Sequence, residues 1–177
     1  MTGRIGKEKR VGKDFVAVLS GVRSLHNVGS IFRTADGAGF SKIYLCGLTP
    51  SPLDRFGRWR PPLAKVSLGA EKTMPWEKSG SALRLIGKLK KEGYRIFALE
   101  QNKRAIPYYK AGLKGGNSGV KIALVVGGEI GGLSFAVLKR ADEILEIPMA
   151  GKKESLNVAV AFGIAAYSLC RLAHRSD

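Results

Sequence analysis

The chain has 177 residues, with 30 Lys and Arg against 14 Asp and Glu, so its formal net charge is +16 and we expect it to bind a polyanion, most commonly nucleic acid. Its 45% apolar and 25% charged residues have the balance of a globular protein and exclude disorder throughout the chain. No apolar run reaches the roughly 18 residues of a membrane span, and the first twenty residues lack the apolar core of a signal peptide, so we expect a cytoplasmic protein. Two cysteines are too few for a disulfide framework and form no CxxC or His/Cys cluster, so we expect no metal.

The first segment is a basic leader. Residues 1–14 combine five Lys and Arg with almost no apolar content, so we predict a flexible arm. The remaining residues, 15–177, are predicted to form a single domain, because their number is close to the roughly 150 residues typical of one domain.

Predicted strands and helices alternate along this domain. The predicted strands lie at residues 15–19, 42–47, 94–99, 122–126 and 144–147. The predicted helices lie at residues 29–37, 81–91, 135–140 and 155–172. Since the strands are apolar almost throughout, the pattern indicates an α/β fold with a mostly parallel sheet and helices on both faces.

The first segment with candidate functional residues is Asn27-x-Gly29-x-x-x-Arg33. Asn27 is expected just before the first helix and Arg33 about one turn inside it, so both side chains could address one anion. An Asn that caps the helix and an Arg on its surface would explain the same residues.

Residues 48–78 show no helical or strand period, and so long a loop in a compact domain is usually functional. Cations beside aromatic side chains suit the phosphates and unstacked bases of single-stranded RNA. A solvated basic loop with one anchoring Trp is the alternative. Phe56 is interleaved with the cations, and the residues predicted to bind RNA are Arg55, Arg58, Trp59, Arg60 and Lys65.

A glycine-rich segment around Glu129 directly follows the predicted strand at 122–126. Glycines allow positive φ and close approach to a ligand. A Walker A loop is excluded because Leu133-Ser134 stand where Lys-Ser/Thr is required, and Glu129 breaks the GxGxxG spacing and would repel a phosphate. A plain tight turn remains the alternative.

The third segment runs from Pro148-Met149 to Ser155-Leu156-Asn157 and opens the last predicted helix. Ser155 is predicted to be the N-cap of this helix. Capping leaves Asn157 unexplained, because Asn is a weak helix former inside a first turn.

Together and in this order, the three segments resemble the motifs of the SpoU (TrmH-like) branch of the SPOUT RNA methyltransferases. The resemblance covers about residues 15–172. Asn-x-Gly-x-x-x-Arg is specific to this branch, and Pro-Met followed by Ser-Leu-Asn is more specific still. One departure is visible, because the second motif often reads Gly-Asn-Glu and Gly128 here replaces the Asn.

The resemblance implies a fold that the residue pattern alone would not suggest, a deep trefoil knot formed by the C-terminal third. It also implies that S-adenosylmethionine binds in the knotted loops and that a methyl group passes to a ribose 2′-hydroxyl of RNA. A homodimer is implied, with the active site completed across the interface. The apolar helix at 155–172 suits that interface, although a role in covering the sheet explains its composition equally well.

The resemblance also assigns roles to individual residues. Arg33 would be the central catalytic residue, as a base or, since a guanidinium holds its proton, as a bidentate clamp on the phosphate beside the target ribose. Asn27 would orient Arg33 or the nucleotide, and Glu129 would hold Arg33 or the ribose. Ser155 and Asn157 would complete the pocket. The residues expected to contact the cofactor are Leu99, Glu100, Gly127, Ile147, Met149, Ser155 and Leu156.

The substrate and three other functions stay open. We expect tRNA in preference to ribosomal RNA, because the chain lacks a separate N-terminal RNA-binding domain, yet relatives acting on either RNA share the motifs. A non-catalytic RNA-binding protein of the same fold would need none of the site residues. The broken GxGxxG argues against a nucleotide-dependent oxidoreductase, and the net charge gives no reason to expect a protein methyltransferase.

Overall fold

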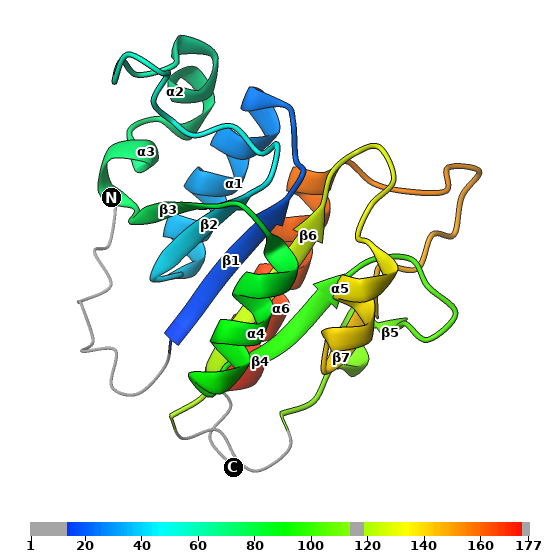
Figure 1. The fold of residues 1–177 in the computed structure, drawn as a ribbon. Coiled ribbons are helices and arrows are strands. Elements are labelled where there is room, and N and C mark those ends of the chain that lie inside the picture. Colours follow the sequence, from blue (N-terminus) through cyan, green and yellow to red (C-terminus); the bar gives the residue numbers. More distant parts are fainter. Residues whose placement is uncertain (1–13, 114–118, 175–177) are drawn as a thin grey trace, which may run out of the picture.

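The computed structural model describes residues 14–113 and 119–174. In this part of the chain, seven strands form one sheet in the order β3-β2-β1-β6-β4-β7-β5, and all neighbouring strands are parallel (Figure 1). The predicted parallel sheet is thereby confirmed. The strands are β1 (Asp14–Ser20), β2 (Lys42–Cys46), β3 (Trp76–Ser79), β4 (Arg95–Leu99), β5 (Ile106–Pro107), β6 (Lys121–Gly127) and β7 (Glu143–Glu146).

Helices cover both faces of the sheet, as predicted (Figure 1). On one face lie α1 (Leu25–Ala38), α2 (Pro61–Ser67), α3 (Ala70–Thr73) and α6 (Val158–His174). On the other lie α4 (Ala82–Lys91) and α5 (Phe135–Arg140). A short 3-10 helix, η1 (Tyr108–Lys110), follows β5.

The apolar run of β1 shows why the strands lack polar alternation. Phe15, Ala17 and Leu19 pack in the core under α1 and α6, whereas Val16 and Val18 pack in the core under α4 and α5. Successive side chains of a strand point to opposite faces, so a sheet covered on both sides needs apolar residues at every position.

The expectation of an irregular loop at 48–78 is wrong, because this segment contains α2, α3 and β3. Both helices are short, and α2 ends at Leu68 in the left-handed region with φ 51°. β3 is an edge strand that exposes Glu77 and Lys78, so it lacks the apolar run of a central strand. Neither β5 nor η1 was predicted.

The start of the predicted domain agrees with the structure to within one residue. The predicted leader falls almost entirely outside the described residues, and Asp14 already begins β1, one residue before the predicted boundary. No helix in the described ranges is long and apolar enough to cross a membrane. The trefoil knot stays a prediction.

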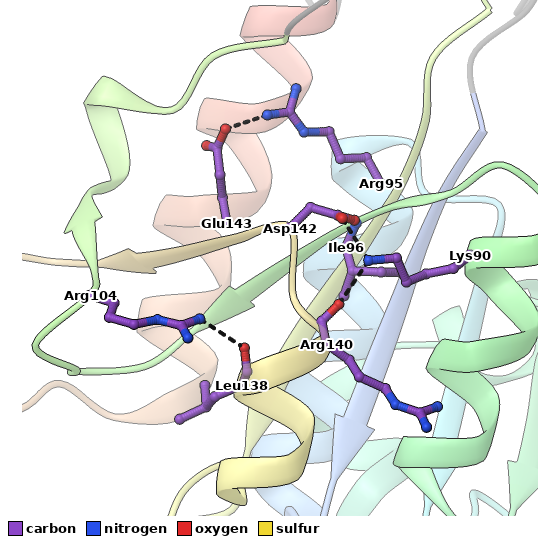
Figure 2. A network of polar contacts seen from close by, with 8 residues as sticks. All are labelled: Lys90, Arg95, Ile96, Arg104, Leu138, Arg140, Asp142 and Glu143. Carbon is purple, nitrogen blue, oxygen red and sulfur yellow. Dashed lines mark hydrogen bonds and ion pairs between the residues drawn. The ribbon is translucent and has the colours of Figure 1, made fainter.

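Polar contacts fix the position of β7 beside β4 (Figure 2). The Lys90 ammonium donates to the Asp142 carboxylate at 2.6 Å, and the other carboxylate oxygen of Asp142 accepts from the backbone N–H of Ile96 at 2.8 Å. An ion pair joins Arg95 of β4 to Glu143 of β7. These contacts tie α4, β4 and the strand that leads into the third motif.

Close packing of α1 on α2 explains the glycine of the first motif. A Cβ at Gly29 would lie 2.6 Å from the carbonyl oxygen of Leu63 and 2.5 Å from Cγ2 of Val66. Because one of these neighbours is backbone, a larger residue at this position would push the helices apart. Gly29 therefore fixes the helix that carries Asn27 and Arg33 against α2.

Candidate active site

A pocket of about 460 Å³ opens where β4, β6 and β7 end, at the edge of the sheet formed by the carboxyl ends of the parallel strands. Ligands of open parallel sheets bind at this edge. The pocket is lined by Leu99, Glu100, Gln101, Val126, Gly127, Gly128, Glu129, Gly132, Glu146, Ile147, Met149, Ser155, Leu156, Asn157, Val158 and Ala161.

All seven residues predicted to contact the cofactor lie around this one pocket. They come from three separate segments, which are the end of β4, the end of β6 and the chain between β7 and α6. Three of the five predicted catalytic residues, Glu129, Ser155 and Asn157, also line it.

The turn after β6 is tight because its glycines lie against backbone. A Cβ at Gly127 would lie 2.5 Å from the carbonyl carbon of Gly132, and the two strands of the turn meet in an antiparallel bridge between Gly128 and Gly132. Gly131 and Gly132 have φ of 81° and 56°, in the left-handed region that glycine enters without strain. The turn thus gives the pocket a wall of backbone.

Glu100 holds this turn in place. Its Oε2 accepts from the backbone N–H of Leu133 at 2.7 Å, and its Oε1 accepts from the N–H of Gln101 at 3.1 Å. The Gln101 side chain donates to the carbonyl oxygen of Glu154, which joins the end of β4 to the third motif. Gln101 was missed in the sequence, although its place directly after a predicted strand was the available signal.

A chain of side-chain hydrogen bonds joins the three motifs. Asn157 donates from Nδ2 to Oδ1 of Asn27 at 3.0 Å, and Asn27 donates from Nδ2 to Oε1 of Glu129 at 2.5 Å. The other carboxylate oxygen of Glu129 accepts from the backbone N–H of Arg23 at 3.4 Å. Residues more than 100 positions apart in sequence therefore meet at the edge of the pocket.

The hydrogen bonds keep Glu129 ionised. Partial desolvation raises the pKa of this carboxyl, but hydrogen bonds from its own backbone N–H, from the Asn27 amide and from the N–H groups of Arg23 and Ser24 outweigh it and lower the pKa below the ordinary value. At neutral pH the site therefore presents a fixed negative charge.

Two expectations about the helix starts are wrong. Helix α6 begins at Val158 rather than at Ser155, and Asn157 caps it, since its Oδ1 accepts from the N–H of Ala159 at 2.9 Å and of Val160 at 3.4 Å. Helix α1 begins at Leu25 with Ser24 as its cap, so Asn27 lies inside the helix. The cap of α6 lies two residues after the expected Ser155, and the cap of α1 lies three residues before Asn27.

Arg33 lies apart from these groups. It follows Asn27 by six residues in α1, which places it about 9 Å along the helix and about 120° around it. Its side chain is exposed and does not line the pocket, and within the described ranges it makes no hydrogen bond or ion pair. The expected contact between Arg33 and Glu129 is therefore absent from the single chain, and Asn27 takes that place.

The double role of Asn157 gives a prediction that separates stability from activity. We expect Asn157→Ala to lower the free energy of unfolding by about 1 kcal/mol through loss of the cap. Asn157→Asp keeps an oxygen for the cap but cannot donate to Asn27, so its stability should stay close to that of the parent, while the methyl transfer that the motif resemblance implies should fall. Denaturant unfolding and an activity assay on both variants check this, and equal activity in Asn157→Asp and the parent would contradict it.

The residues predicted to bind RNA lie between β2 and α3. Arg55, Arg58 and Lys65 are exposed, and Trp59 keeps 41% of its surface exposed. Arg60 is half-buried, and its Nε donates to the carbonyl oxygen of Leu53 at 3.4 Å. Arg60 therefore supports the local backbone as well as contributing charge.

Comparison with known proteins finds relatives that are named as RNA methyltransferases. The sequence model described as the SpoU rRNA Methylase family matches residues 14–167. The 23S rRNA (guanosine-2'-O-)-methyltransferase RlmB of Xanthomonas axonopodis pv. citri is 30% identical over 164 residues, which are 93% of this chain and 61% of that protein. The chain thus spans about three fifths of the length of this curated relative.

Two solved structures share the fold. The rRNA methyltransferase of Sinorhizobium meliloti, solved with AdoMet bound, is 25% identical with a TM-score of 0.77, and the match covers 92% of this chain and 57% of that one. A protein solved for insight into 2-OH methylation of C/U34 on tRNA is 28% identical with a TM-score of 0.68, and the match covers 89% of this chain and 95% of that one.

Proposed function

Because the chain belongs to the SpoU methylase family, we propose that it transfers a methyl group from S-adenosylmethionine to a ribose 2′-hydroxyl of RNA. Its relatives support this reaction, since they are named for 2′-O-methylation of guanosine in 23S rRNA and 2-OH methylation of tRNA. The pocket and the hydrogen-bonded motifs beside it supply the structural argument.

The observation that carries the proposal is the charge of the pocket lining. The chain has a net charge of +16, yet the lining includes Glu100, Glu129 and Glu146 and no Lys or Arg. Such a lining disfavours a phosphate-bearing cofactor and suits a cationic one. S-adenosylmethionine, when bound, supplies a methyl group on a positively charged sulfur.

The size and walls of the pocket also fit this cofactor. A volume of about 460 Å³ lies in the ordinary range for small-ligand sites. Apolar side chains for an adenine ring come from Leu99, Ile147, Met149 and Leu156, and the glycine turn after β6 presents backbone where side chains would otherwise fill the space.

The chain's own residues position the nucleotide. The fixed carboxylate of Glu129 can accept a hydrogen bond from a ribose hydroxyl, and Asn27 and Asn157 hold that carboxylate in one orientation. Ser155 lines the same pocket and can add a further hydrogen bond. Holding the attacking oxygen in line at near-contact distance accounts for much of the acceleration such a transfer needs. Arg33 acts as a clamp on the adjacent phosphate, because a guanidinium retains its proton.

A homodimer would bring Arg33 to a pocket. Helix α6 exposes Val160 and Tyr167, an apolar surface of the kind that oligomers bury. A Cβ at Gly37 would lie 3.1 Å from the hydroxyl of Tyr167, so the two helices meet there, and Arg33 lies one turn before Gly37 on the same side of α1. Arg33 therefore borders the surface that a second copy would cover, and in the dimer it serves the partner's pocket.

The RNA would also contact the exposed basic segment before α3, through Arg55, Arg58, Trp59, Arg60 and Lys65. We expect tRNA as the substrate in the cytoplasm. This expectation is supported by the tRNA 2-OH methylation protein, of which this chain covers nearly the whole length. Ribosomal RNA is the other candidate, supported by RlmB.

Methyl incorporation from labelled S-adenosylmethionine tests the proposal directly. Unmodified tRNA and ribosomal RNA are incubated separately with the protein, and the product is digested to nucleosides. We expect label in tRNA, recovered as a 2′-O-methyl nucleoside. Label in ribosomal RNA alone would overturn the tRNA expectation and keep the reaction, whereas cofactor binding without label in either RNA would contradict the proposed activity on these substrates.

A further inference from the structure

Between β2 and α2 the chain forms a small hairpin, residues 52–60, whose conformation is set by one carboxylate. Oδ1 of Asp54 accepts from the backbone N–H of Phe56 at 2.8 Å and of Arg58 at 3.0 Å, and Oδ2 accepts from Nε of Arg58 at 3.0 Å. The hairpin is closed by backbone bonds from Asp54 to Arg58 and from Arg60 to Pro52, and Leu53 and Trp59 pair in an antiparallel bridge.

The tip of this hairpin presents an aromatic ring to solvent. Phe56 keeps 65% of its surface exposed, so its ring is accessible to a ligand. The guanidinium carbons of Arg55 and Arg58 lie 4.6 Å and 5.0 Å from the centre of its ring. Arg58 is held by Asp54, whereas Arg55 makes no hydrogen bond or ion pair with any described residue and is free to turn toward a phosphate.

The hairpin is tied to the edge of the sheet that carries the pocket. Before it, the buried Thr49 donates to the carbonyl oxygen of Leu19 at 3.0 Å and accepts from the N–H of Val22 at 3.1 Å, between β1 and α1. After it, α2 packs against α1 at Gly29. Both ends of the hairpin are therefore fixed relative to α1 and to Asn27.

We propose that Phe56 is a stacking platform for an unstacked base of the RNA, held at a fixed offset from the pocket by the Asp54-organised hairpin. This inference rests on the proposed function and deepens it, since it requires that the substrate offer a single-stranded nucleotide away from the methylated one. Aromatic rings stack on any base, and neighbouring cations bind the phosphates. A second copy of this chain is a poorer occupant, because the apolar surface proposed for it lies on α6, at Val160 and Tyr167.

Fluorescence anisotropy with a mixed-sequence single-stranded oligoribonucleotide tests the platform in the full chain. We expect Phe56→Ala to weaken binding by roughly 5- to 150-fold, the effect of losing one base stack, without changing the salt dependence. Phe56→Trp should bind like the parent. Arg55→Ala should reduce the slope of log affinity against log salt by about 0.7, the value for one phosphate contact on a single strand. Unchanged affinity in Phe56→Ala would overturn the proposal.

Asp54 gives the sharpest test, because a role in charge and a role in positioning predict opposite changes in RNA affinity when Asp54 is replaced by Ala. Removing an acidic side chain from a basic surface should strengthen RNA binding if charge alone matters. We expect Asp54→Ala to weaken binding about as much as Phe56→Ala, since the ring loses its fixed position, and Asp54→Asn to restore it, because the amide oxygen still accepts from the two N–H groups. Tighter binding by Asp54→Ala would contradict the positioning role.

The matched control is Tyr109→Ala. Tyr109 is 56% exposed and follows β5, at the edge of the sheet opposite β3, so its loss should leave binding unchanged. Weaker self-association of Phe56→Ala with unchanged RNA affinity would assign the ring to a protein contact instead. Because the assay needs no methyl transfer, Phe56-dependent binding without methylation would overturn the proposed activity alone, and methylation without Phe56-dependent binding would overturn the platform alone.

Discussion

Replacing Arg33 by Ala is expected to lower methyl transfer by at least ~100-fold while leaving the affinity for S-adenosylmethionine unchanged. Arg33 does not line the pocket, so the cofactor loses no contact within one chain. The lost rate reflects a fixed positive charge that no longer faces the phosphate and the developing negative charge on the ribose oxygen. Single-turnover incorporation and calorimetric cofactor binding measure the two quantities, and turnover within a few-fold of the parent would show that Arg33 has no catalytic role.

Mixing two inactive variants tests whether Arg33 acts across a dimer. In a mixed dimer of Arg33→Ala and Glu129→Gln subunits, one pocket would keep its own Glu129 and receive Arg33 from the partner. Activity should therefore return on mixing, although each variant alone is inactive. Absence of recovery, with dimers shown by light scattering, would place Arg33 at the pocket of its own chain and contradict the interface proposed for α1 and α6.

The fold could be predicted wherever burial set the residue pattern. The strand at 122–126 was recognised because a strand covered on both faces is apolar throughout, and the helix at 135–140 was placed with the bounds that the structure gives. The helices and the strand within residues 48–78 were not predicted, because they are too short to show a period. The edge strand β3 also lacks the apolar run by which the central strands were predicted, because Glu77 and Lys78 are solvent-exposed.

The positions of the site motifs could be predicted from the sequence, but the contacts between them could not. Each motif could be placed near the end of a strand or the start of a helix from local pattern, and parallel strands then bring those ends to one edge. The bonds between motifs could not be predicted, because the pairing of Asn27 with Glu129 spans 102 positions and depends on which rotamers the packed helices allow. The cap at Asn157 was misplaced to Ser155, because both residues are good caps and no local signal separates them.

The backbone packed around Gly128 leaves no room for a side chain. The related motif often has Asn at this position, yet we expect Gly128→Asn to destabilise the chain by about 1–3 kcal/mol, the usual cost of overpacking, and to lower methyl transfer by as much as ~100-fold. A Cβ at Gly128 would lie 2.0 Å from the carbonyl oxygen of Gly21 and 2.7 Å from its carbonyl carbon. Both neighbours are backbone, so no side-chain rotation relieves the clash.

The clash would spread directly to the groups that we propose to be catalytic. Gly128 donates its N–H to the carbonyl oxygen of Ser20 at 3.0 Å, so its backbone is pinned to the end of β1. Displacing Gly21 moves Arg23, whose N–H binds Glu129, and Ser24, which caps the helix that carries Asn27. Gly151→Ala is the matched control, because no atom lies within 4 Å of a Cβ there. Thermal unfolding and methyl incorporation on both variants decide the point, and a fully active, stable Gly128→Asn would show that the ends of β1 and β6 separate at little cost.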